Sequence, residues 1–261
     1  MSEDTAAVAR RRTGALLAAV AVVVLGLVAV VAGLVVAWGH RGDSVAAPAA
    51  VGATTAAVPP AGATVAPAPS SVAGSVVPDE LSWVTVAGAR VPVSGTAGPR
   101  DSGGGRARGF AHTPLGAVLA AVHISVRLSP QVGPAVFEPT LREQVVGADA
   151  AALGRHLDED YQAARAQLGL PYGAPAGRLY STTTGYRVDL PGPDAATVWL
   201  LIEGPGHDGG SVLVAVVTQV RWTGTDWALR APSRGDWSTD AAVVTDPTGY
   251  TRFPNRSADG G

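Results

Sequence analysis

The stretch TPLGAVLAAVHISVRL, residues 113–128, decides the fold of the globular part of this chain. Thr113 is a good N-cap residue and Pro114 suits the first helical position, so the stretch predicts a helix that begins there. One side of this helix consists of large aliphatic residues, Leu115, Val118, Leu119, Val122 and Val126. A second side consists of small residues, Gly116, Ala117, Ala120 and Ala121. The small side is suited to close packing against a neighbouring element.

Two further helices are expected after this one. Pro139 is a candidate first residue of a short helix that ends at Gly147. Asp149 is a candidate N-cap of a third helix, which Gly169 and Pro171 would end. The apolar residues of that third helix fall on one stripe: Leu153, Leu157, Tyr161, Ala164 and Leu168.

The hydrophobic period changes to that of strands after Pro171. Four segments are rich in β-branched and aromatic residues, at 178–190, 196–203, 211–222 and 226–232. The sequence TGTD at 223–226 predicts a hairpin turn, across which Trp222 and Trp227 can pair. A short strand or hairpin is expected at 81–94 and a short strand around Val243. Helices followed by strands predict an α+β domain in which the helices pack on one face of a curved antiparallel sheet.

The N-terminal part predicts a membrane anchor. Residues 14–38 contain no charged residue, and as a helix they would be about 37 Å long, against a hydrocarbon core of ~30 Å. The alternative, a cleavable signal peptide, has an apolar core of only about 7–15 residues. Three arginines at 10–12 precede the run, which places the N-terminus in the cytoplasm and the rest of the chain outside. Small residues at Ala29, Gly33 and Ala37 would allow two such helices to approach, so a homo-oligomer is possible.

These observations divide the chain into five parts. The expected parts are a cytoplasmic tail at 1–13, a transmembrane helix at 14–38, a disordered Ala/Pro-rich spacer at 39–80, an extracytoplasmic α+β domain at 81–250 and a tail at 251–261. The spacer is expected to be disordered because its prolines block helices and sheets, and because it has too little bulky apolar surface to offset the entropy of ordering.

Composition excludes several classes of function. The formal net charge is −2 and the chain has no basic footprint, so direct nucleic-acid binding is not expected. There is no cysteine, which excludes disulfides, thiolate catalysis and cysteine-based metal sites. All the Lys+Arg residues are arginine. A GxSxG nucleophile elbow is also missing from the sequence.

The histidines are the first candidates for chemistry, and each has a simpler interpretation. His40 lies at the membrane edge, and His112 precedes the first helix, where a solvated or capping role is the default. His123 lies beside the apolar stripe of that helix and is expected to be a packed residue. His156 and Asp160 are four residues apart on one helical face and could bind a metal, but a closed site needs further ligands.

The remaining candidates are isolated. His207 and Asp208 fall in a loop between two predicted strands. Asp189, Glu203 and His123 would serve as acid–base residues only if the fold brought them into one pocket. We therefore assign no catalytic, cofactor-binding or metal-binding residue, and predict that the chain is not an enzyme and needs no cofactor.

Several segments carry a family resemblance. They are WVTVAGARVPVS at 83–94, AGP at 97–99, GFAHTPLGAVLAAVHI at 109–124, VFEPTLREQVVG at 136–147, GYRV at 185–188 and WTGTDWALRAP at 222–232. Together they resemble a family of actinobacterial single-pass membrane proteins that are often carried by plasmids and integrative conjugative elements. The family brings no site residues with it.

The order of elements resembles the cystatin-like cone of the nuclear-transport-factor-two-like folds. The layout as a whole is similar to the assembly-factor subunit of type IV secretion systems, which joins one membrane helix to an external cone domain. The resemblance implies a membrane-anchored extracytoplasmic scaffold or assembly component of a conjugative DNA-transfer apparatus, whose partners are the lipid bilayer and other subunits of a membrane complex.

Two alternatives share this architecture. One is an accessory membrane subunit of an actinobacterial lipid importer, and the other is a cone domain that binds a small ligand or acts as an isomerase. The interior of the sheet separates them from a scaffold. An interior pocket of several hundred Å³ with converging polar groups would favour a ligand or an enzyme. An interior filled by side chains, for which Trp199, Leu201 and Tyr180 are the candidates, would favour a scaffold.

Overall fold

The computed structural model describes residues 81–206 and 209–254. The predicted cytoplasmic tail, transmembrane helix and spacer lie outside these ranges, as do His40, His207 and Asp208. Within the described ranges, no helix is both long enough and apolar enough to cross a bilayer.

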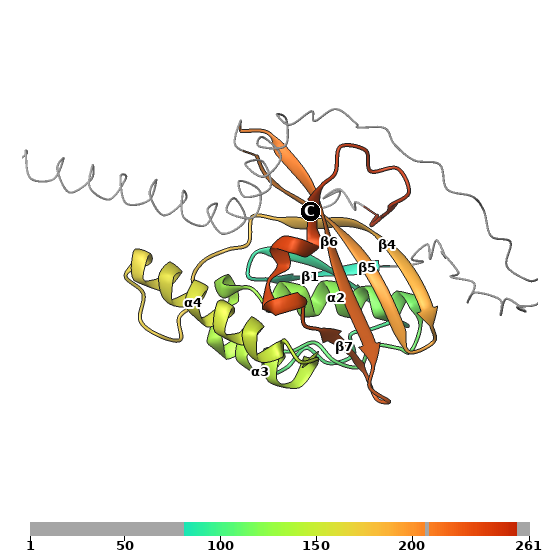
Figure 1. The fold of residues 1–261 in the computed structure, drawn as a ribbon, viewed down its shortest axis with the longest axis horizontal. Helices are drawn as coiled ribbons and strands as arrows, with labels where there is room; N and C mark the ends of the chain where they lie inside the picture. Colours follow the sequence, from blue (N-terminus) through green and yellow to red (C-terminus); the bar gives the residue numbers. More distant parts are fainter. Residues whose placement is uncertain (1–80, 207–208, 255–261) are drawn as a thin grey trace, which may run out of the picture.

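The described part is a mixed α+β fold (Figure 1). Its α-helices are α2 (Pro114–Arg127), α3 (Pro134–Gln144) and α4 (Ala150–Leu168). A separate hairpin consists of β1 (Leu81–Val86) and β2 (Ala89–Ser94). The larger sheet consists of β3 (Val145–Val146), β4 (Thr182–Gly192), β5 (Ala195–Pro205), β6 (Ser211–Trp222), β7 (Trp227–Arg230), β8 (Ala241–Val243) and β9 (Thr251–Arg252).

The larger sheet is built around the predicted meander. Its strand order is β3-β7-β6-β5-β4-β9, and β8 pairs with β6 next to β7. All pairs are antiparallel except β3 with β7. Side chains alternate between the two faces, so Val188 and Val198 lie on the inner face, which packs on α2, and their neighbours Arg187 and Trp199 lie on the outer face.

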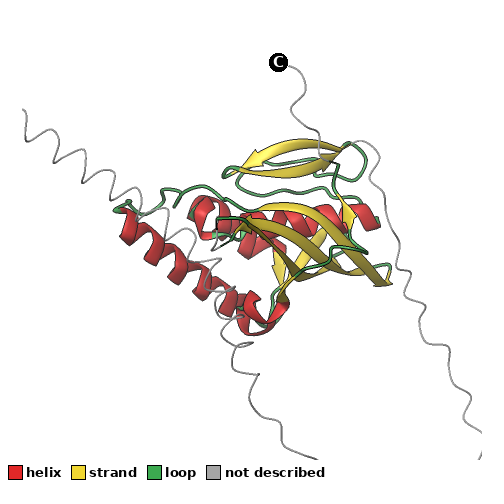
Figure 2. Ribbon diagram, turned by 90° about the horizontal axis from the view of Figure 1, so that it is seen from above, coloured by secondary structure: helices red, strands yellow, loops and turns green. Residues whose placement is uncertain are grey.

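Helix α2 lies between the β1–β2 hairpin and the larger sheet (Figures 1 and 2). The predicted cap is present, because the Thr113 side chain accepts a hydrogen bond from the Gly116 amide at 3.1 Å. Ala117–Val122 all have a relative exposure of 0%. The two apolar sides of α2 therefore meet two different layers, and the helix fills the inner face of the sheet.

Gly116 has a further reason to be glycine. A Cβ atom at this position would lie only 2.0 Å from the carbonyl oxygen of Ala111, because the chain that leads into α2 folds back onto its first turn. The same carbonyl accepts a hydrogen bond from the indole Nε1 of Trp227 at 2.9 Å. Glycine thus makes room for a backbone segment that the sheet holds in place.

The predicted turn between β6 and β7 is what holds that segment. Thr223 N donates to Asp226 O at 2.9 Å, and the rings of Trp222 and Trp227 meet edge to face with centroids 5.6 Å apart. The Asp226 carboxylate accepts hydrogen bonds from the amides of Gly109 and Phe110, at 2.7 and 3.1 Å. Two segments of the family resemblance, 109–124 and 222–232, are therefore in direct contact.

The second predicted helix has different bounds. It begins at Pro134, five residues before Pro139, which lies inside it, and it ends at Gln144 and not at Gly147. Both prolines fit the pattern of a first helical residue, but Pro134 follows Gly133, whose positive φ of 81° turns the chain into the helix. The helix ends early because Val145 and Val146 pair with β7.

The third predicted helix is α4, and Gly169 ends it in the left-handed conformation with φ 65°. Asp149 occupies the N-cap position, but its side chain makes no capping hydrogen bond, so that part of the prediction is wrong. Leu153, Leu157 and Tyr161 of the predicted stripe are buried.

The sheet extends past position 250, where the domain was expected to end. Thr251 and Arg252 form β9 against β4, and Phe253 has an exposure of 3%. Its ring packs against Tyr186 and Trp83, with centroid distances of 5.0 and 6.1 Å. The first residues of the predicted C-terminal tail therefore belong to the core.

Candidate functional site

His123 is a packed residue of the core, as expected. Its exposure is 0%, and its Nε2 lies 2.8 Å from the carbonyl oxygen of Pro92 in β2. Arg127 Nη1 donates to His123 Nδ1 at 3.0 Å, so the ring is neutral and carries its proton on Nε2. Burial lowers the pKa of His123 to about 4, helped by the positive charge of Arg127, although the Pro92 hydrogen bond opposes the shift. This histidine joins α2 to the hairpin.

Arg127 was not singled out by the sequence, yet it is almost as buried, with 4% exposure. Burial lowers the pKa of its guanidinium to about 10. Within the described ranges it forms no ion pair with a carboxylate. Its Nη1 donates instead to the ring and to the backbone carbonyl of His123. The only sequence signal for this pairing was the four-residue spacing on one helix.

His112 has specific partners on the surface. Its ring stacks on Trp222, with centroids 4.2 Å apart and planes 9° from parallel. Its Nε2 lies 2.9 Å from the Pro193 carbonyl oxygen and 3.0 Å from Asp194 Oδ1. The imidazole therefore connects the start of α2 with the β4–β5 turn. These specific contacts differ from the solvated or capping role that was expected of His112.

His156 and Asp160 lie on α4 beside the segment that follows β7. The Nδ1 atom of His156 is 3.0 Å from the carbonyl oxygen of Gly235. Burial raises the pKa of Asp160, although the nearby His156 acts in the opposite direction. Among the residues described, no three histidine or acidic side chains come together as a possible metal site.

The acid–base residues considered from the sequence are not brought together. Asp189 pairs in register with Thr197 near one end of β5, and Glu203 pairs with Thr182 near the other end. Both lie on the outer face by strand alternation, whereas His123 is in the core. The geometry therefore assembles no catalytic group from these three residues.

The three side chains that were expected to fill the interior of the sheet do not lie there. Trp199 points to the outer face, where Arg187 stacks over its ring with the guanidinium carbon 4.0 Å from the centroid. Tyr180 is 58% exposed, and Leu201 is buried but belongs to the outer side of β5. Helix α2 occupies the interior in their place, because its small residues let it approach the sheet closely.

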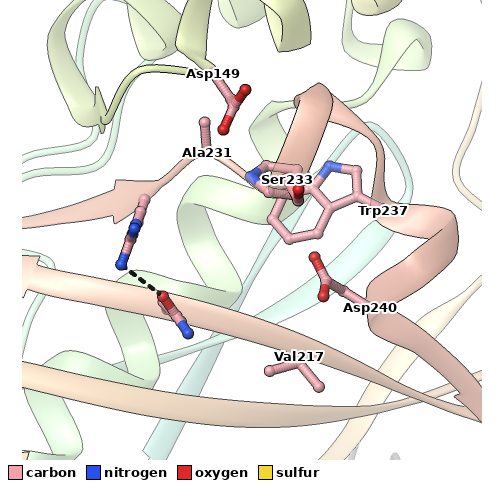
Figure 3. Close-up of a pocket in the computed structure, with 9 residues that line it drawn as sticks. Asp149, Val217, Ala231, Ser233, Trp237 and Asp240 are labelled. Atoms are coloured by element: carbon pink, nitrogen blue, oxygen red, sulfur yellow. Dashed lines mark hydrogen bonds between the residues drawn. The ribbon is translucent and has the colours of Figure 1, made fainter.

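A pocket of about 270 Å³ opens on the outer face of the sheet (Figure 3). We call it the outer pocket. Its floor includes Val217 and Gln219 of β6, and Arg230 at the end of β7 donates to Gln219 Oε1 at 3.4 Å. Asp149 contributes a wall from the start of α4, and Trp237 and Asp240 contribute another.

The wall with Trp237 consists of two short 3₁₀ helices, η2 (Ser233–Gly235) and η3 (Trp237–Asp240). Gly235 packs so tightly on α4 that a Cβ would lie 2.2 Å from the Leu153 nitrogen. Asp236 caps η3 by accepting from Ser238 N and Oγ at 2.8 and 2.7 Å, and these hydrogen bonds lower its pKa. The pocket wall is therefore fixed by the packing of Gly235 on α4 and by the Asp236 cap of η3.

No pattern in the sequence predicts the outer pocket. Residues after Ser233 lack any hydrophobic period, and we expected only irregular structure there with one short strand. The pocket forms because this irregular segment returns over β6 and packs on α4, which brings together residues far apart in the chain. Local pattern does not encode such an approach.

A family model described as "Domain of unknown function (DUF8175)" matches residues 44–252. The match includes part of the predicted spacer and nearly all of the described domain. Comparison with curated proteins and comparison with solved structures each found no match.

Proposed function

The chain belongs to the DUF8175 family, and from its geometry we propose that it is a membrane-anchored extracytoplasmic scaffold, which assembles other envelope proteins through its surface. The observation that carries this proposal is the filled interior. Residues Ala117–Val122 of α2 have no exposed surface and occupy the inner face of the sheet, where a ligand would bind in an open cone. Binding is thereby left to the outside of the domain.

The outer face of the sheet offers features typical of a protein interface. Trp199 is half-buried and Arg187 is exposed, and both residue types are enriched where proteins meet. Val217 lies directly across from Trp199 on β6 and also lines the outer pocket. A row of side chains, Val217, Trp199 and Arg187, therefore leads from the outer pocket across β6, β5 and β4.

The finer parts of the proposal come from the sequence. We assign the fold to the cystatin-like cone class, because the helices α2, α3 and α4 precede the antiparallel meander from β4 to β7, and this meander packs on α2. The uncharged run at 14–38 would anchor the chain in the membrane, with the arginines at 10–12 in the cytoplasm. The apparatus we propose is one for conjugative DNA transfer, on the family resemblance of the quoted segments.

Capture of the partner in living cells tests the scaffold function. The chain contains neither lysine nor cysteine, so amine crosslinkers cannot label the domain and a single introduced cysteine is unique. Arg221→Cys places a thiol on the exposed outer face of β6, and Tyr180→Cys places one on the exposed segment before β4 as a matched control. Each variant of the full chain is coupled to a maleimide–benzophenone and irradiated in its native host.

We expect discrete crosslinked proteins from position 221 in excess over position 180. Subunits of a DNA-transfer apparatus among them would support the proposed function, and subunits of a lipid importer would favour that alternative. Equal, diffuse crosslinking at both positions, or none at either, would contradict a scaffold that acts through the outer face.

A further inference from the structure

The outer pocket contains two carboxylates that have no partner among the described residues. The Asp149 side chain does not cap α4, and Asp240 accepts no hydrogen bond from the described part of the chain. In Figure 3 the two carboxylates come from different elements, on either side of the Trp237 indole. Burial and the neighbouring Asp236 raise the pKa of Asp240, which indicates that its charge is poorly compensated.

The net negative charge of the pocket favours a cationic ligand. Its charged lining residues are Asp149, Asp240 and one cationic residue, Arg230, so one negative charge remains uncompensated. Arg230 is directed along the floor, where it donates to Gln219. It forms no ion pair with either carboxylate in the described part of the chain.

The shape and composition of the pocket favour a guanidinium over other cations. A guanidinium is planar, stacks on an indole, and can donate to two carboxylates at once through its fork of N–H groups. Trp237 supplies the indole, and Asp149 and Asp240 supply acceptors on either side of it. A volume of about 270 Å³ can hold one such side chain with its water but not a large cofactor.

We propose that the outer pocket binds the guanidinium group of an arginine side chain presented by a partner protein. This inference rests on the proposed scaffold function, because it names the chemistry by which the outer face recognises its partner. The arginine acts as an anchor residue in a pocket, and the row from Val217 to Trp199 supports the surface around it.

Fluorine NMR of the full-length protein in detergent tests the binding. The six tryptophans are replaced by 5-fluorotryptophan, and Trp237→Phe identifies the resonance of Trp237. The probe is N-acetyl-arginine N-methylamide, and the control is the same molecule with citrulline, which keeps the shape and loses the charge. We expect the arginine probe to shift the Trp237 resonance saturably, with a Kd of about 1–10 mM for a single side chain.

Three variants locate the binding. Asp149→Asn and Asp240→Asn are each expected to weaken arginine binding at least tenfold. Glu159→Gln, which removes one charge from an exposed position of α4, is expected to leave it unchanged. The other five fluorine resonances report whether a variant remains folded.

Equal binding of the citrulline probe, unchanged binding in both asparagine variants, or the absence of a saturable shift would overturn the arginine pocket. The scaffold function has a separate readout, since capture of a partner at position 221 does not require arginine. Capture that persists in the Asp240→Asn background, together with no arginine binding, would refute this inference and leave the scaffold standing. Arginine binding without any captured partner would refute the scaffold.

Discussion

Replacing Trp227 with alanine is expected to lower the free energy of unfolding by about 3–5 kcal/mol. Trp227 is 2% exposed, and its indole donates to the Ala111 carbonyl at 2.9 Å. The substitution would leave a large cavity between the sheet and the segment that leads into α2, and it would remove one of the two hydrogen bonds that the Ala111 carbonyl accepts, the other coming from the Thr113 amide at 2.8 Å. Urea unfolding of residues 81–254, followed by far-ultraviolet circular dichroism, measures the loss.

Two variants show where the effect arises. Trp227→Phe keeps most of the buried ring and removes the hydrogen bond, so it should cost less, about 1–3 kcal/mol. Trp222→Ala, on the other side of the same turn, removes a half-buried ring that stacks on His112 and should also cost less than Trp227→Ala. A loss below about 1 kcal/mol for Trp227→Ala would mean that the turn does not hold α2 in place.

Acidification is expected to destabilise the domain by about 3 kcal/mol between pH 6.5 and pH 4 through His123. The folded state keeps this imidazole neutral, with a pKa of about 4, while the unfolded chain takes up a proton near the ordinary value of 6.5. The unfolded state therefore binds more protons between these two values, and stability falls as the pH falls. Well above pH 6.5 both states are neutral and the penalty disappears.

The comparison with His123→Gln isolates this contribution. Glutamine can still accept from Arg127 and donate toward the Pro92 carbonyl, but it does not titrate. Free energies of unfolding from urea titrations at several pH values should decline less steeply in the variant between pH 6.5 and pH 4, whatever its absolute stability. Parallel curves for the two proteins would show that His123 is not held neutral in the fold.

Some of this structure follows directly from local sequence. Three features depend only on residues a few positions apart, so residue type and spacing predict them. They are the Thr113 cap, the Trp222–Trp227 pair and the end of α4 at Gly169. The α+β class follows from the change of hydrophobic period after Pro171. The packed role of His123 follows from its position beside an apolar stripe.

Other features depend on contacts between distant segments. The choice of Pro134 over Pro139 as the first residue of α3 rests on the conformation of Gly133, and the early end of α3 depends on pairing with β7. The outward direction of Trp199 follows from the strand register, since a shift by one residue would reverse it. The outer pocket forms only because residues 233–240 fold back over β6. No local sequence pattern predicts this contact.

The most direct test of the central claim is the side of the membrane on which the folded domain lies. Tyr180→Cys and Ser2→Cys each give the full chain a single thiol, one on the domain and one in the predicted cytoplasmic tail. Intact cells are treated with a membrane-impermeant maleimide before and after lysis. A membrane-anchored external scaffold predicts that position 180 is labelled in intact cells and position 2 only after lysis. Labelling of position 180 only after lysis, in cells whose surface proteins are labelled normally, would contradict it.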